Sequence, residues 1–83
     1  MEYYLLIARS VTHAQQMART LEQCGVRAGI LRTPAGLTQS GCAYAVRIRK
    51  PQEERGRNCL QQAQLLPKSV FAREDGCYRE VVW

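Results

Sequence analysis

The chain has 83 residues, so its length predicts one domain over residues 1–83 with a thin hydrophobic core. Its formal charge is +5, but the basic residues are scattered and form no dense run, so nucleic acid is a weak candidate ligand. No apolar stretch approaches the ~20 residues that a membrane span needs, and Glu2 stands where a signal peptide carries basic residues. The composition therefore predicts a cytoplasmic protein with no membrane partner.

The chain contains four cysteines, which are Cys24, Cys42, Cys59 and Cys77. Zinc sites usually show paired ligands a few residues apart, and no C-x-x-C pair or neighbouring histidine is present, so we expect no metal and no cofactor. Because thiols stay reduced in the cytoplasm, we also expect four independent thiols and no disulfide framework. Cys24 and Cys59 lie at apolar helix positions and are predicted to be core residues.

The first third of the chain predicts a strand followed by a helix. The run YYLLIA at residues 3–8 is rich in strand formers and is typical of a strand buried inside a sheet. Apolar residues then recur at helical spacing, which predicts a helix over about residues 12–24, and the following glycine supplies its stop. Thr12 with Gln15 forms a capping-box pattern, and Ser10 is a second candidate for the cap.

Two more strands are predicted on either side of a polar loop. Residues 27–32 form the first of them, and Pro34 ends it. The loop over residues 34–41 contains glycines and hydroxyl side chains and leads into Cys42. The strand behind it alternates, because successive side chains point to opposite faces. One face takes Cys42, Tyr44, Val46 and Ile48, and the other takes Ala43, Ala45, Arg47 and Arg49.

The last third predicts a second helix, a fourth strand and a terminal hairpin. The helix is expected to run up to Pro67. Its inner face is expected to carry Cys59, Leu60, Ala63 and Leu66. The run SVFAR at residues 69–73 predicts the fourth strand. Asp75-Gly76 is a strong hairpin signal, so residues 77–83 are expected to fold back as an extra strand.

The order strand, helix, strand, strand, helix, strand makes two split β-α-β units. We therefore predict an α+β protein of ferredoxin-like fold, βαββαβ, with an antiparallel sheet and both helices on one face. In this topology the first strand lies between the third and the fourth, and the second lies at the edge beside the third. The loop before Cys42 then lies at the end of the sheet where the first helix begins.

Cys42 is the candidate reactive residue. The thiolate is the reactive form, and its pKa of ~8.5 falls near helix N-termini and cationic groups. The residues expected to gather around it are Arg9, Thr12, His13, Arg32 and Lys68. Ser40 and Gly41 would let a hydroxyl and the backbone approach the sulfur. The alternative is that Cys42 only packs, because it begins the inward-facing set of its strand. His13 is expected to be a surface residue of the helix cap and not a base.

Three segments carry a family resemblance: YLLIARSVTHAQQMARTLEQCGV, the turn LRTP, and SGCAYAVR. Their order resembles the selenium/sulfur carrier protein-like family, in which a capped helix, a Thr-Pro turn and a Ser-rich loop precede a Cys-Gly pair and a strand. The resemblance covers about residues 3–73. Ala43 stands where the family has the glycine, and the loop before Cys42 is one residue longer.

The resemblance implies a carrier that is not an enzyme. Cys42 would hold sulfur or selenium as a persulfide or perselenide. A cysteine desulfurase-type donor would supply the atom, and an acceptor protein would remove it.

A second interpretation is a non-catalytic interaction or regulatory module, such as a homodimer formed through the open face of the sheet. Its contact residues would be Ala43, Ala45, Arg47, Arg49, Tyr3 or Tyr4, and the terminal Trp83. A third interpretation, RNA binding, depends only on the positive charge.

Overall fold

The computed structural model describes residues 2–34, 36–37 and 44–83. Within them the chain forms one five-stranded sheet and two α-helices. The strands are β1 (Tyr3–Ile7), β2 (Ala28–Arg32), β3 (Tyr44–Arg49), β4 (Ser69–Glu74) and β5 (Cys77–Val81). The helices are α1 (Val11–Gln23) and α2 (Glu53–Gln62), and a 3-10 turn, η1 (Lys50–Gln52), leads into α2.

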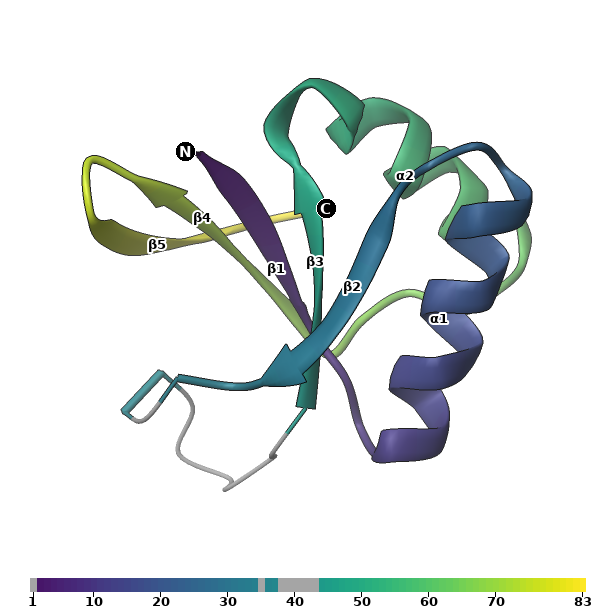
Figure 1. Ribbon diagram of the computed structural model, residues 1–83, viewed down its shortest axis with the longest axis horizontal. Helices are drawn as coiled ribbons and strands as arrows, with labels where there is room; N and C mark the ends of the chain where they lie inside the picture. The colour runs from purple at the N-terminus through teal and green to yellow at the C-terminus, as the bar shows by residue number, and fades with distance from the viewer. Residues whose placement is uncertain (1, 35, 38–43) are drawn as a thin grey trace.

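The sheet has the order β2-β3-β1-β4-β5, and all of its neighbouring strands are antiparallel. Both helices lie on the same side of it (Figure 1). This confirms the predicted α+β, ferredoxin-like arrangement, with β5 added beside β4. The turn that adds β5 follows the predicted chemistry, because Asp75 (φ 53°) and Gly76 (φ 79°) both adopt the left-handed conformation that a two-residue hairpin turn needs.

The two helices end by the same hydrogen-bond pattern but with different residues. After α1, Gly25 has φ 83° and the Val26 N–H donates to the Leu21 carbonyl at 2.9 Å. After α2, Gln64 takes the left-handed position (φ 57°), and the N–H of the next residue, Leu65, donates back into the helix. The prediction that α2 reaches Pro67 is therefore wrong. Leu65 packs against the core, whereas the predicted inner residues Ala63 and Leu66 are exposed.

The main core lies between the sheet and the two helices. Its fully buried side chains are Leu6, Met17, Leu21, Val26, Val46, Ile48 and Leu60. The alternation predicted for β3 holds here, because Val46 and Ile48 face this core and Tyr44 packs against it. Gly56 allows α2 to approach the sheet closely, since a Cβ at this position would lie 3.0 Å from Cδ1 of Ile48.

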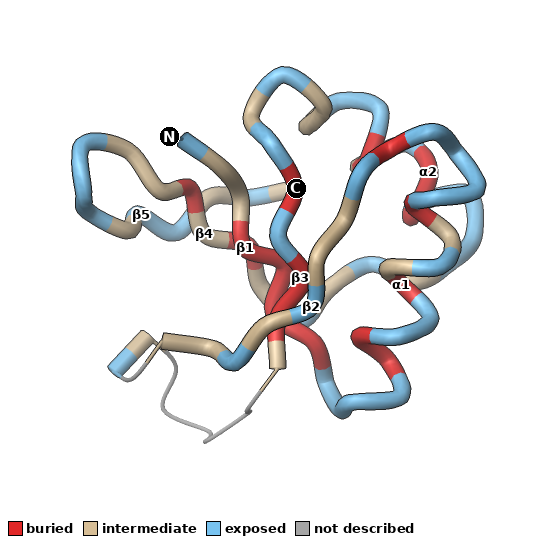
Figure 2. Tube along the Cα trace, viewed as in Figure 1, coloured by how far each residue is buried: buried red, intermediate tan, exposed pale blue. Residues whose placement is uncertain are grey.

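The opposite face of the sheet is also buried, but only at one end. Leu5, Ile7 and Ala45 have no exposed surface, and buried segments of β1 and β3 are red in Figure 2. Leu31, Leu37, Phe71 and two tyrosines pack against these three residues. The prediction that Ala45 contributes to an open contact face is therefore wrong, because these neighbours cover it.

Candidate functional site

One end of the sheet brings the entry of α1 next to the start of β3. The Ala8 N–H, just beyond β1, donates to the Tyr44 carbonyl at 3.1 Å. The Lys68 N–H, just before β4, donates to the Ile7 carbonyl at 2.9 Å. At this same end of the sheet, Arg32 of the edge strand β2 lies opposite Tyr44 of β3 in the antiparallel register. The topological prediction that the start of β3 lies beside the amino end of α1 therefore holds for Tyr44.

Four of the predicted site residues lie outside the described residues. They are Ser40, Gly41, Cys42 and Ala43. Their closeness to α1 therefore stays a prediction. The described members of the predicted site are Arg9, Thr12, His13, Arg32 and Lys68.

Ser10, and not Thr12, caps α1. Its backbone is extended, and its Oγ accepts a hydrogen bond from the His13 N–H at 3.1 Å. Thr12 is exposed in the first turn, so the predicted capping box with Gln15 is wrong. Among the described residues, the N–H groups of Val11 and Thr12 have no hydrogen-bond partner, and they leave a partial positive charge at this helix end.

His13 is buried, with 9% of its surface exposed, which corrects the prediction of a surface residue. Its Nδ1 accepts a hydrogen bond from the Arg9 N–H at 3.0 Å, so the ring ties the segment before the helix to its first turn. Burial lowers the pKa of His13, and the charge of Arg9 lowers it further, although a hydrogen bond to the Leu65 backbone opposes this. The imidazole is therefore neutral at neutral pH.

Arg32 is the exposed cation at the start of the loop. Its Cζ lies 5.7 Å from the centre of the Tyr44 ring, a cation–π contact across the two strand ends. This contact links the residues on either side of the segment that contains Cys42. Arg9 is exposed at the entry of α1, so these two exposed cations come from different parts of the chain.

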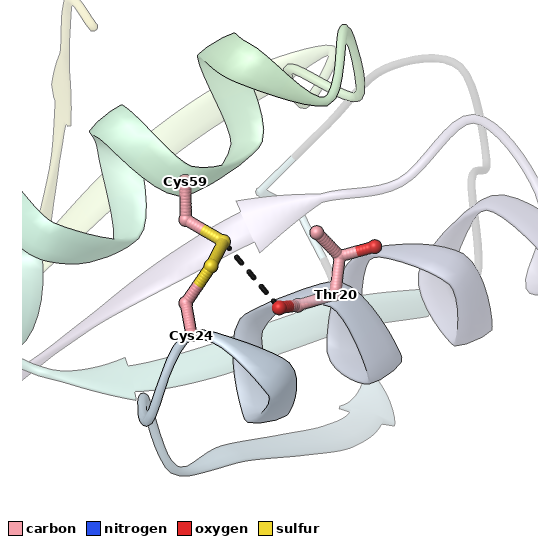
Figure 3. The surroundings of a disulfide bond; sticks show 3 residues. All are labelled: Thr20, Cys24 and Cys59. Carbon is pink, nitrogen blue, oxygen red and sulfur yellow. Dashed lines mark hydrogen bonds between the residues drawn. A yellow bond between two sulfur atoms is a disulfide. The ribbon is translucent and has the colours of Figure 1, made fainter.

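The remaining cysteines do not behave as three independent thiols. Cys24 and Cys59 form a disulfide between the end of α1 and the last turn of α2, with their Cα atoms 6.4 Å apart (Figure 3). Cys59 is buried as predicted, whereas Cys24 is exposed, so its assignment to the core is wrong. Cys77 is an exposed free thiol. The only sequence signal for the pairing is that both helices pack on one face of the sheet.

The other end of this face carries a cluster of arginine and tyrosine side chains, of which the sequence predicted Tyr3 and Arg47 for an open face but not Arg73 and Tyr78. The hydroxyls of Tyr3 and Tyr78 lie 3.0 Å apart, and Arg73 donates to both, at 3.1 Å and 3.4 Å respectively. The Cζ of Arg47 lies 5.5 Å from the centre of the Tyr3 ring. Trp83, predicted for this face, packs instead against the helix-side core.

The cluster shifts the pKa values of its two tyrosines in opposite directions. Burial raises the pKa of Tyr3, but the hydrogen bonds of Tyr78 and Arg73 and the nearby charges outweigh burial, so the net pKa is lowered. Burial and the hydrogen bond to Tyr3 raise the pKa of Tyr78. Tyr3 is therefore the member of the pair that loses its proton first.

Of the three comparisons with known proteins, the one with family models gave a match. Residues 3–72 match the family model described as "Putative Se/S carrier protein-like". The curated proteins and the solved structures gave no match. No helix among the described residues is long and apolar enough to cross a membrane. Since the match spans most of the sequence, the chain belongs to the Se/S carrier protein-like family.

Proposed function

We propose that this protein carries sulfur or selenium on Cys42, as a persulfide or perselenide passed between a donor and an acceptor protein. Family membership supports the cargo, and the matched residues 3–72 include Cys42. The observation that carries the proposal is the hydrogen bond from the Ala8 N–H to the Tyr44 carbonyl. Cys42 is two residues before Tyr44, and two residues span at most about 7 Å.

The surroundings of Tyr44 suit an anionic sulfur species. The unpaired N–H groups of Val11 and Thr12 and the guanidinium groups of Arg9 and Arg32 all favour negative charge at this end of the sheet. His13 is not among these groups. Its backbone N–H donates to Ser10 Oγ, and its Nδ1 accepts a hydrogen bond from the Arg9 N–H. We therefore assign the activation of the thiol to helix amides and arginines, without a histidine base.

The transfer requires no net oxidation. The Cys42 thiolate attacks the outer sulfur of a persulfide on a cysteine desulfurase-type donor. The donor's own thiolate leaves, and Cys42 becomes the persulfide anion. Attack by an acceptor nucleophile on the outer sulfur reverses these roles and restores the Cys42 thiolate. Selenium follows the same steps. Because the protein only accepts and passes on the atom, it acts under this proposal as a carrier and not as an enzyme. The cycle needs a compartment that keeps Cys42 reduced, which the cytoplasm provides.

Intact-mass spectrometry with site mapping tests the carrier. The folded protein is incubated with a cysteine desulfurase and cysteine, beside the variants Cys42→Ser and Cys77→Ser. We expect the added sulfur on Cys42, its loss in Cys42→Ser and its retention in Cys77→Ser. Cys77 is the matched control because it is a free, exposed thiol at the far end of the sheet. Equal modification of Cys42 and Cys77, or none, contradicts the proposal.

The second candidate function is an interaction module, and the arginine–tyrosine cluster favours it. Arg47, Arg49 and Arg73 lie on the face that the helices leave uncovered, and the described residues offer them no ion-pair partner. Such a surface suits a carboxylate-rich protein partner. Under this alternative, Cys42→Ser leaves partner binding or self-association unchanged, whereas the pair Arg47→Gln and Arg73→Gln weakens it. Sedimentation and binding assays with both variants separate the two functions.

A further inference from the structure

The Cys24–Cys59 disulfide lies in a hollow between the two helices. The hollow has a volume of about 390 Å³. Its lining residues are Cys24, Glu54, Arg55, Asn58, Cys59 and Gln62. Cys24 is exposed, whereas only 7% of the surface of Cys59 is accessible. Of the two cysteines, Cys24 is therefore the more accessible to a nucleophile from solvent.

A backbone carbonyl lies where the buried Cys59 thiol could donate a hydrogen bond after reduction. Sγ of Cys59 lies 3.4 Å from the Thr20 carbonyl oxygen, and Figure 3 shows this contact. A disulfide sulfur carries no hydrogen, so the contact is not a hydrogen bond while the bond to Cys24 exists. Once reduced, the Cys59 thiol can donate to that carbonyl without moving far. Reduction therefore does not leave the buried thiol without an acceptor.

The polar side chains of the hollow supply charges of both signs. Arg55 extends over the end of α1, since a Cβ on Gly25 would lie 3.5 Å from its Nη1. Glu54 lines the same hollow, and neither side chain has an ion-pair partner among the described residues. Arg55 can bind a carboxylate, and Glu54 can bind an ammonium group. Asn58 and Gln62 offer amide donors and acceptors between them.

We propose that the Cys24–Cys59 pair is a thiol–disulfide exchange site for zwitterionic peptide thiols of the glutathione class. The peptide thiolate attacks Sγ of Cys24, a mixed disulfide forms, and Cys59 leaves as a thiolate that takes a proton. A second peptide thiolate attacks the peptide sulfur of the mixed disulfide and releases Cys24. Two peptide thiols are oxidised to one peptide disulfide while the protein disulfide is reduced to a dithiol. This site uses no residue of the proposed carrier site.

The exchange has a structural consequence for the two helices. The disulfide closes a loop between positions 35 residues apart, so the oxidised chain has fewer unfolded conformations than the reduced one. Leu21 and Leu60 pack in the core that both helices share, so we expect the dithiol form to keep the fold but to unfold more easily. The redox state of this pair therefore sets the stability of the helix layer.

The test uses the oxidised double variant Cys42→Ser, Cys77→Ser, which leaves Cys24 and Cys59 as the only cysteines. It is incubated with glutathione at native conditions, quenched in acid, alkylated and mapped by mass spectrometry. We expect a mixed disulfide on Cys24 followed by the dithiol, with the far-ultraviolet circular dichroism unchanged. A bond that glutathione opens only after denaturant is added, or a mixed disulfide found equally on Cys59, overturns the proposal.

Charge variants test the class of thiol. Within the same background, Arg55→Gln and Glu54→Gln are expected to slow exchange with glutathione severalfold more than exchange with 2-mercaptoethanol, whose thiolate carries neither a carboxylate nor an ammonium group. Arg19→Gln is the matched control, because it removes the same charge from an exposed residue of α1 that lines a different hollow. Equal rates of glutathione exchange in all three variants overturn the peptide-thiol assignment. Because Cys42 is absent, every outcome is independent of the carrier proposal.

Discussion

Neighbouring residues of β1 show how differently the two faces of the sheet are closed. Leu6 faces the layer formed by α1 and α2, and its core neighbours come from both helices and from the adjacent strands. Leu5 faces the other side, where Leu37 and Phe71 cover it without any helix. Both leucines have no exposed surface. Leu5 and Leu6 are thus equally buried, but only the face that contains Leu6 is covered by helices.

The second face is also divided along its length. Ile7 and Ala45 pair at the end beside the start of β3, where the face is apolar. Tyr3 pairs with Arg49 and Arg73 at the other end, where the face is cationic and aromatic. The helix-covered face is therefore apolar throughout its core, whereas the second face combines a small apolar cluster with a cationic and aromatic end.

The largest expected effect separates the two leucines. Leu6→Ala should destabilise the protein by about 3–5 kcal/mol, because the helices enclose the cavity and prevent collapse. Leu5→Ala should cost less, at about 2–3 kcal/mol, because side chains and a loop segment can move into the space. Urea unfolding at equilibrium measures both values. An equal or larger loss for Leu5→Ala contradicts the difference between the faces.

A change of pH should act on the helix-covered side through His13, the only histidine of the chain. The pKa of His13 in the folded protein is below the ordinary 6.5. Between these two pKa values the unfolded chain therefore binds a proton that the folded protein does not bind. The free energy of unfolding should therefore fall as the pH drops through 6.5 towards the folded pKa. Above 6.5 this dependence should be absent. His13→Asn keeps an acceptor for the Arg9 N–H and should remove the effect.

Urea unfolding at several pH values between neutral and mildly acidic conditions checks this second prediction. The Ser10→Ala variant is a useful control, because it weakens the cap of α1 but retains the histidine. It should lower stability by a similar amount at every pH. A pH dependence that survives in His13→Asn would assign it to the carboxylates instead.

The smallest effect concerns the open face. Arg73→Gln should raise the pKa of Tyr3, because it removes a hydrogen bond and a positive charge that favour the tyrosinate. The lowered pKa stabilises the folded protein fully above the ordinary value of 10.0, and this contribution is lost as the pH falls through the folded pKa, so stability at neutral pH should change little through this group. Tyrosine-selective NMR titration follows the shift, with Tyr3→Phe identifying the resonance. An unchanged Tyr3 titration contradicts the assigned role of Arg73.

Local rules predicted most of the fold because each element has its own signal. The alternation from Tyr44 to Ile48 follows from the two-residue period of a strand. Asp75-Gly76 tolerates the left-handed backbone that the hairpin needs, and Gly25 does the same after α1. Each of these signals lies within a few consecutive residues, so these elements could be predicted without knowledge of tertiary contacts.

The incorrect predictions arise where no local residue type signals the structure, either at a helix end or where two distant segments meet. Gln64 adopts a left-handed conformation without a glycine because the Leu65 N–H can then bond the Leu60 carbonyl, and no local residue type announces this. His13 is buried because its ring bonds Arg9 and meets the Leu65 backbone. The partner of Cys24 depends on how α1 and α2 pack, which spacing alone does not specify. The environment of Cys42 remains a prediction from topology.

The added strand β5 changes what the sheet presents at its border. The family match ends at residue 72, so β5 lies outside it. Without β5, the edge would be β4, whose Val70, Phe71 and Ala72 form an apolar row with unpaired backbone groups, a template for aggregation. With β5 in place, the outermost strand carries the charged pair Arg79 and Glu80, both exposed. The C-terminal hairpin therefore replaces an apolar sheet edge with one that carries exposed charges, a feature that disfavours edge-to-edge pairing.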